Sequence, residues 1–96
     1  MIIVVIRVSK LKSRQHLKLS TYNVRSLLRT GRLYQLTSGC KALNLDIIAI
    51  QEHRWKTTTE TTMLKTDGYH FVYSSANEMS QGGVGLLIKN NLAKHI

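Results

Sequence analysis

The stretch that decides the fold is Asp46-Ile47-Ile48-Ala49-Ile50-Gln51-Glu52, in which an apolar run of four residues is followed by an amide and a carboxylate. A short apolar run of this kind is typical of a strand buried on both faces of a covered sheet. A carboxylate at the carboxyl end of such a strand lies at the sheet edge where open α/β sheets place ligands and metals. We therefore predict a buried strand over residues 45–51 and a candidate ligand at Glu52.

The segment before this stretch is expected to supply a strand and a helix. Alternating apolar and polar residues predict a strand over residues 17–23, which ends at Asn23. Residues 24–30 are expected to form a loop, and helical spacing then predicts a helix over residues 32–44. The apolar stripe of that helix, which we expect to face the core, consists of Leu33, Leu36, Cys40 and Leu43.

A strand, a helix and a strand in this order form a βαβ unit, whose two strands run parallel. The carboxyl ends of parallel strands lie at one edge of the sheet, so Asn23 and Glu52 are expected to lie close together. A carboxylate beside an amide suits Mg²⁺, which prefers oxygen ligands and often takes only one or two carboxylates plus a substrate phosphate. The alternative is that Glu52 is an exposed residue at a strand end and Asn23 merely forms a turn.

The remainder of the chain predicts two more strands. Residues 53–67 are polar and rich in threonine, which favours a loop or a short irregular helix. A strand is expected over residues 69–74, with its three aromatic side chains on one face: Tyr69, Phe71 and Tyr73. Gly82-Gly83 is expected to open a further strand over residues 84–89, which Asn90-Asn91 ends.

The charge of the chain points to a polyanionic partner. The formal net charge is +9, and the segment from Arg7 to Arg32 holds eight lysines and arginines with no acid. Nucleic acid is the commonest partner of such a segment, although a solvated basic face that binds nothing specific is an equally good interpretation. Nothing in the sequence indicates a small-molecule cofactor, and the oligomeric state is left open.

The cysteine content and the N-terminal apolar run also exclude some classes of protein. A single cysteine, Cys40, excludes an internal disulfide and is expected to be a small buried hydrophobe. The apolar run 1–6 is far shorter than the roughly 20 residues that span a bilayer, and it lacks the features of a signal peptide. We therefore expect an intracellular protein that does not associate with membranes. A nuclear location is compatible with this expectation. Residues 1–6 are either an extra strand or a poorly ordered leader.

Three motifs together resemble the endonuclease/exonuclease/phosphatase superfamily. They are Thr21-Tyr22-Asn23-Val24-Arg25-Ser26-Leu27, the stretch from Asp46 to Trp55, and Gly82-Gly83-Val84-Gly85. More narrowly, they are similar to the apurinic-type endonuclease domain of non-LTR retrotransposons and to the craniofacial development protein 2-like sequences derived from it. The resemblance covers residues 18–96 as a partial domain and leaves residues 1–17 outside it as a basic and apolar leader.

The resemblance implies an α/β fold, the N-terminal and incomplete part of a four-layer αββα sandwich. It also implies a Mg²⁺-dependent phosphodiesterase site, with Mn²⁺ as an alternative ion and DNA as the substrate. Glu52 matches the family's metal-binding glutamate, and Asn23 matches its asparagine near metal and phosphate. Gly82 and Gly83 match a strand start at which the backbone packs closely.

Residues beside these positions are candidates for contacts with DNA. Arg25 follows Asn23 at the same sheet edge, and Arg54 follows Glu52, so both are candidate phosphate ligands. Trp55 is expected to pack its ring into the local core and not to stack on a base. His53 is not expected to act as a general base, because the family that the chain resembles does not place its base at this position.

The sequence departs from the family in its second half. The family's active-site tyrosine, its Asp-x-Asn motif and its Ser-Asp-His motif have no match in these 96 residues. Three hypotheses follow: part of a Mg²⁺-dependent endonuclease that is inactive alone, a small basic nucleic-acid-binding module, or a non-functional retrotransposon remnant. Binding that weakens steeply with salt would mark the second, and poor solubility from an uncovered sheet face would mark the third.

Overall fold

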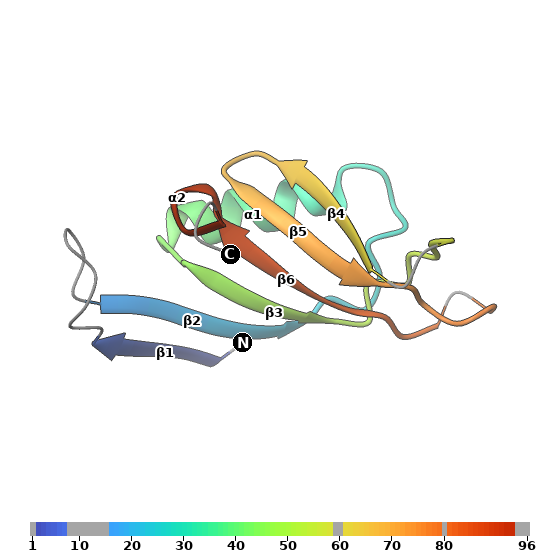
Figure 1. The fold of residues 1–96 in the computed structure, drawn as a ribbon, viewed down its shortest axis with the longest axis horizontal. Coiled ribbons are helices and arrows are strands. Elements are labelled where there is room, and N and C mark those ends of the chain that lie inside the picture. Colours follow the sequence, from blue (N-terminus) through green and yellow to red (C-terminus); the bar gives the residue numbers. More distant parts are fainter. Residues whose placement is uncertain (1, 8–15, 59–60, 80, 94–96) are drawn as a thin grey trace.

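The chain folds around one six-stranded sheet in the computed structural model, which describes residues 2–7, 16–58, 61–79 and 81–93. The strand order is β1-β2-β3-β6-β5-β4, and helix α1 lies behind the sheet in the view of Figure 1. The predicted α/β class is confirmed at this level. The elements are β1 (Ile2–Arg7), β2 (His16–Asn23), α1 (Arg32–Ala42), β3 (Ile47–Gln51), β4 (Thr61–Thr66), β5 (Tyr69–Ser74), β6 (Val84–Lys89) and α2 (Asn90–Ala93).

The predicted βαβ unit is confirmed. Strands β2 and β3 pair in parallel, with Leu19 opposite Ile47 at one end and Asn23 opposite Gln51 at the other. The connecting helix α1 ends at Ala42, and Asn44 adopts a left-handed φ of 54°, as expected of a residue that stops a helix. This pairing brings the end of β2 and the residue that follows β3 to the same edge of the sheet.

The expected apolar stripe of α1 is correct for three residues and wrong for Leu43. Cys40 is buried, and Leu33 and Leu36 pack against the core, but Leu43 caps the helix and is 44% exposed. The helix instead buries Thr37, whose hydroxyl donates to the Tyr34 carbonyl at 3.1 Å. This hydrogen bond allows a polar residue that the predicted stripe did not include to be buried in the core.

The core lies between α1 and one face of the sheet. Its buried side chains come from α1, β3, β5 and β6 and from the loops after β2 and α1: Val24, Leu27, Cys40, Leu45, Ile48, Ile50, Tyr69, Phe71 and Leu87. Tyr69 donates its hydroxyl to the Leu45 carbonyl at 2.6 Å, and burial raises the pKa of Tyr69 to about 12. Burial likewise raises the pKa of Cys40 to about 11, as expected of an unreactive core thiol.

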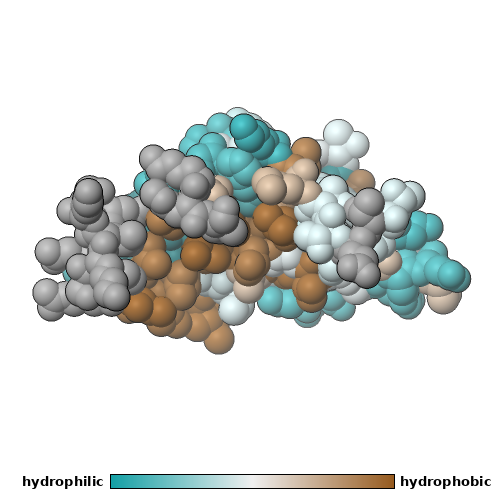
Figure 2. Space-filling model, viewed as in Figure 1, coloured by the Kyte–Doolittle hydropathy of each residue, from teal (hydrophilic) through white to brown (hydrophobic). Residues whose placement is uncertain are grey.

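The expectation that β3 is covered on both faces is wrong for the described residues. Ile48 and Ile50 are fully buried against α1, whereas Ile47 and Ala49 point to the opposite face and are only partly buried. Figure 2, viewed from that opposite face, shows hydrophobic residues gathered over the strands on the β1 side of the sheet. The sheet therefore has one packed face and one apolar face, on which α2 contacts β5 and β6 and Ile88 is buried, while the described residues leave the part over β1, β2 and β3 open.

The segment expected to be a loop or short helix contains a strand. Residues 61–66 form β4, which pairs antiparallel with β5 through the two-residue turn Asp67-Gly68. An Asp-Gly pair between two β-prone segments is a strong hairpin signal, and threonine is itself enriched in strands. These two signals could have identified β4 from the sequence.

The N-terminal apolar run is a strand and not only a leader. β1 pairs antiparallel with β2, with Ile2 opposite Thr21 and Arg7 opposite His16. It therefore extends the same sheet that residues 18–96 build, although residues 8–15 lie outside the described part. None of the helices in the described residues is long and apolar enough to cross a membrane.

Candidate functional site

Three segments meet at the edge of the sheet where β2 and β3 end. They are residues 23–27, 51–54 and 82–83, and we call their meeting place the rim. The Val24 amide donates to the Gln51 carbonyl at 3.0 Å, continuing the β2–β3 ladder beyond the strands. The rim therefore joins Asn23 and the residue after Gln51, as the sequence predicted.

Glu52 is held from both sides through its backbone. Its amide donates to the Gly83 carbonyl at 2.8 Å, and its carbonyl accepts from the Ser26 amide at 2.7 Å. Glu52 adopts a left-handed φ of 60° and is half-buried. Its backbone is thus fixed between the loop after β2 and the turn before β6.

Asn23 forms a turn at the rim, as one of the two alternatives expected. Its side-chain oxygen accepts the Arg25 amide at 3.1 Å, which shapes the loop after β2. An amide oxygen has a second lone pair, and Asn23 is exposed, so this turn leaves the side chain able to contact a ligand. The turn and the ligand hypotheses for Asn23 are therefore compatible.

Unfavourable backbone conformations concentrate at the rim. In the described part of the chain, positive φ values occur here at Arg25, Ser26, Glu52, Arg54, Gly82 and Gly83, and elsewhere only at Gly31, Asn44 and Gly68. A non-glycine residue in such a conformation costs on the order of 1–3 kcal/mol, and such residues cluster at ligand-binding and catalytic sites. The clustering is an indication of function that is independent of side-chain identity.

His53 is a buried residue that packs against the rim at Gly83. Its ring is fully buried, and its Nδ1 accepts the Trp55 amide at 2.9 Å, so the neutral ring carries its proton on Nε2. Within the described residues, Nε2 has no partner at hydrogen-bonding distance. A Cβ added to Gly83 would lie 2.4 Å from Cε1 of this ring. The close packing expected at Gly82 and Gly83 is confirmed at Gly83, where its cause is the His53 ring, and is wrong at Gly82, where an added Cβ would meet no atom within 4 Å.

The buried ring makes the stability of the chain depend on pH. Burial lowers the pKa of His53 below its ordinary 6.5, and weaker backbone interactions with Ser74 and Val84 oppose that shift in part. The unfolded state therefore binds more protons than the folded state once the pH falls below about 6.5. The contribution of His53 is fully present above that pH and is lost as the pH falls toward the lowered pKa.

We expect the free energy of unfolding, measured with urea between pH 7.5 and pH 5, to fall less steeply in His53→Asn than in the natural chain. The Asn carbonyl can still accept the Trp55 amide but does not titrate, so the difference in slope isolates His53. The other three histidines of the chain remain in both proteins and cancel in the comparison. Equal slopes would contradict the buried neutral ring.

The remaining neighbours divide into packing and surface residues. Trp55 donates its ring N–H to the Leu27 carbonyl at 2.9 Å and meets Phe71 edge-on at 5.7 Å, so the expected packing role is confirmed. Arg25 is exposed, whereas Arg54 is half-buried and donates its amide to the Gly82 carbonyl at 2.9 Å. Contact of either guanidinium with a phosphate stays a prediction.

The donors at the rim fit a hard cation but do not enclose one. Glu52 and Asn23 offer one carboxylate and one amide oxygen, the ligand types that Mg²⁺ prefers. The described residues contain no group of three or more histidine, cysteine, aspartate or glutamate side chains that could hold a metal ion. Such a site could hold an ion only together with waters and a ligand phosphate.

The comparisons with known proteins give no match. No family model, curated protein or solved structure matches this chain.

Proposed function

We propose that the rim is the first part of a Mg²⁺-dependent phosphodiesterase site that acts on DNA, with Mn²⁺ as an alternative ion. The observation that carries the proposal is the placement of Asn23 and Glu52 at adjacent strand ends on a strained backbone. The resemblance of the motifs at these positions to the endonuclease/exonuclease/phosphatase superfamily supports the same assignment. On this proposal the sheet and α1 form two layers of a four-layer αββα sandwich.

Each rim residue has a specific role in the proposed site. The Glu52 carboxylate holds the ion, and the Asn23 amide holds either the ion or a phosphate oxygen. Arg25 and Arg54 supply guanidinium groups that contact phosphates of the DNA backbone. A bound Mg²⁺ would polarise a phosphoryl oxygen and stabilise the leaving oxygen.

A direct test is calorimetric titration of the chain with Mn²⁺ and Mg²⁺ in the presence of a short DNA oligonucleotide. Glu52→Gln should weaken binding of the ion at least about tenfold, because it removes the only carboxylate of the proposed site. Glu78→Gln is the matched control, since Glu78 is an exposed acid on the loop before β6. Equal affinities of the two variants would count against the rim as the metal site.

The chain alone should not cut DNA measurably. The 96 residues lack matches to the family's tyrosine, Asp-x-Asn and Ser-Asp-His motifs. Residues that act as a unit in catalysis are strongly non-additive, so part of the set retains little of the rate. Supercoiled plasmid incubated with the chain and Mg²⁺ should stay supercoiled. Robust nicking that Glu52→Ala abolishes would show that the site is complete without those motifs.

A second candidate is a basic nucleic-acid-binding module without chemistry. The exposed Arg25 and Arg29 lie in the loop at the rim, which favours contacts with phosphates there. Arg7 in β1 and Lys18 in β2, however, lie toward the other end of these strands, away from the rim. DNA binding that weakens steeply with salt and that Glu52→Gln leaves unchanged would favour this candidate.

A further inference from the structure

Strand β1 forms one edge of the sheet, and no element of the described residues lies beyond it (Figure 1). Residues 2–6 are all β-branched and apolar, and their side chains are between 42% and 67% exposed. Natural edge strands are usually protected from further pairing by charged side chains, prolines or bulges. The other edge strand, β4, carries Lys65 and three threonines, whereas residues 2–6 contain neither a charge nor a proline. The edge of β1 is therefore suited to pairing with another strand.

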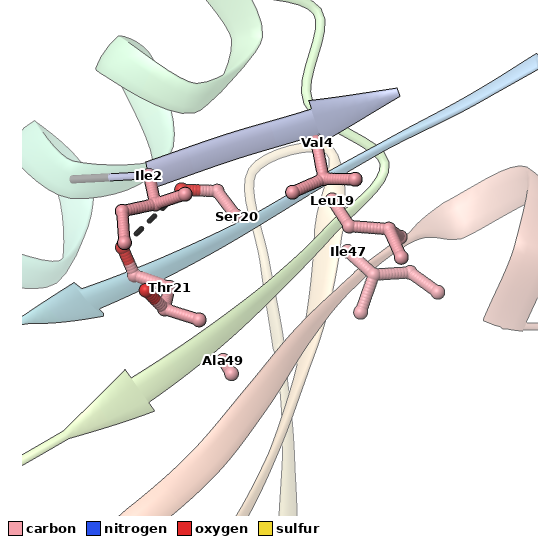
Figure 3. Close-up of a pocket in the computed structure, with 7 residues that line it drawn as sticks. All are labelled: Ile2, Val4, Leu19, Ser20, Thr21, Ile47 and Ala49. Atoms are coloured by element: carbon pink, nitrogen blue, oxygen red, sulfur yellow. Dashed lines mark hydrogen bonds between the residues drawn. The ribbon is translucent and has the colours of Figure 1, made fainter. Parts of the chain in front are cut away.

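Both faces of β1 are apolar. Val4 lines the hollow of about 410 Å³ over β1, β2 and β3, where Figure 3 shows it beside Leu19 and Ile47. Ile3 and Val5 alternate with Val4 and so point to the α1 side of the sheet, yet they are 44% and 55% exposed because α1 does not cover them. A solvated strand normally carries polar side chains on one of its faces. The composition of β1 is thus typical of a strand inside a wider sheet.

The hydrogen bonds of β2 show which backbone groups of β1 face the free edge. The Lys18 amide donates to the Asp46 carboxylate at 2.8 Å, and the Lys18 carbonyl accepts the Asp46 amide at 2.9 Å. Because these directions alternate along a strand, the even-numbered residues of β2 bond toward β3 and the odd-numbered ones toward β1. The odd-numbered residues of β2 lie opposite the even-numbered residues of β1. The N–H and C=O groups of Ile3 and Val5 therefore point outward, away from β2.

We propose that two copies of this chain pair antiparallel through their β1 edges, about a two-fold axis that places Val4 of one copy opposite Val4 of the second. In this register Ile3 of each copy lies opposite Val5 of the second copy. Such a pair exchanges two N–H···O bonds, so the outward backbone groups of both residues are satisfied. The two sheets then continue into one another across the axis.

This register makes full use of the apolar residues. Residues 2–6 pair only with residues 2–6 of the second copy, and β-branched side chains directly opposite one another stabilise a sheet. A register that brings Arg7 opposite Ile3 would instead place a charge within the paired segment. In the proposed register the two Arg7 residues lie at opposite ends of the pair, about 20 Å apart at roughly 3.4 Å per residue. That separation exceeds the Debye length of about 8 Å at physiological salt, so their repulsion is largely screened.

The proposed interface is closed and small. A two-fold axis makes it isologous, so β1 of each copy is paired and the joined sheet ends in β4 on both sides. A pair of strands this short buries less than the roughly 1,200 Å² at the lower end of standard interfaces, so we expect a reversible dimer. The pairing leaves the face opposite α1 uncovered in both copies. It is therefore compatible with the four-layer sandwich of the proposed function and does not rest on it.

Hydrogen exchange of the backbone amides, followed by NMR, tests the proposed hydrogen bonds directly. Between about 20 and about 500 μM chain, the amides of Ile3 and Val5 should become more protected with concentration. Those of Val4 and Ile6, which bond to β2, should not change. Over the same range the sedimenting mass should approach twice that of one chain. A mass of one chain throughout would overturn the proposal, and so would assemblies that keep growing, because these would indicate open-ended pairing of β1 with β4.

The register is tested with Val4→Lys and Val4→Glu. Either variant alone places like charges opposite one another and should raise the dissociation constant at least about fivefold, whereas an equal mixture of the two should restore the dimer. Met63→Lys is the matched control, because it places a charge on the other edge strand at an apolar side chain that is 64% exposed. Met63→Lys should dimerise as the natural chain does. Equal weakening by Met63→Lys, or a mixture that dimerises no better than its components, would contradict this pairing.

Val5→Pro serves if the Val4 variants lose their folded circular dichroism spectra. Proline removes the outward N–H of Val5 and is tolerated on an edge strand where that group does not bond to the neighbouring strand. The two-fold axis doubles the effect, so the dissociation constant should rise at least about tenfold. A dimer that Val5→Pro leaves unchanged would show that the β1 edge is not the interface.

Discussion

The Gly83→Ala variant is expected to lose about 3 kcal/mol of unfolding free energy and to disturb the rim. Gly83 has a φ of 91°, which alanine adopts at a cost of about 1–2 kcal/mol. The added Cβ would also lie 2.4 Å from Cε1 of the buried His53 ring, and relieving such an overlap costs about 1–3 kcal/mol. Because the Gly83 carbonyl accepts the Glu52 amide, the shift reaches the candidate metal ligand.

The neighbouring glycine provides the control for this effect. Gly82 has a similar φ of 75°, but a Cβ there would meet no atom within 4 Å. Gly82→Ala should therefore cost only the free energy of the left-handed backbone conformation, about 1–2 kcal/mol. Urea unfolding of both variants measures the difference. Equal losses would mean that the His53 ring does not pack against Gly83.

The Phe71→Ala variant should lose about 3–5 kcal/mol, as large truncations in a core do. Phe71 is fully buried on β5 and stacks on Tyr73 with ring centroids 4.7 Å apart. It also meets the rings of His53 and Trp55 edge-on at 5.9 and 5.7 Å, so its loss leaves a cavity directly beneath the rim. Since small domains are stable by only about 5–15 kcal/mol, the variant should be largely unfolded in mild denaturant.

Tyr34→Ala is the matched control for this truncation. Tyr34 is an aromatic residue on α1 that is 63% exposed, so its removal should change the unfolding free energy by no more than about 0.5 kcal/mol. Thermal and urea unfolding followed by circular dichroism compare the two variants. A small effect of Phe71→Ala would place the core elsewhere than between α1 and the sheet.

The sequence predicted the strands and the helix that show a hydrophobic pattern within their own residues. β2, α1, β3, β5 and β6 follow from alternation, helical spacing and the apolar run, and the parallel pairing of β2 with β3 follows from their order. β4 was missed because its threonines were weighed as polar loop residues, although Asp67-Gly68 predicts a hairpin. The open face could not be foreseen, because an apolar run does not reveal which of its two faces the rest of the chain covers.

The candidate ligands Asn23 and Glu52 could be predicted from the sequence, but the packing of His53 at the rim could not. The meeting of Asn23 and Glu52 followed from topology, since parallel strands end at one edge. The role of His53 depends on Gly83, which lies 30 positions further along the chain, and no local pattern connects the two. The left-handed conformations of Glu52 and Arg54 are equally invisible in the sequence, because neither residue type favours them.

The most direct test of the proposed site is Mn²⁺ paramagnetic relaxation of the backbone amide signals of the isotopically labelled chain. Limiting Mn²⁺ should first broaden the amides of residues 23–27, 51–54 and 82–83. Glu52→Gln should abolish this broadening, whereas Glu78→Gln should retain it. Broadening centred on Asp67 or Glu78, or broadening of the rim that persists in Glu52→Gln, would contradict a metal site built on Asn23 and Glu52.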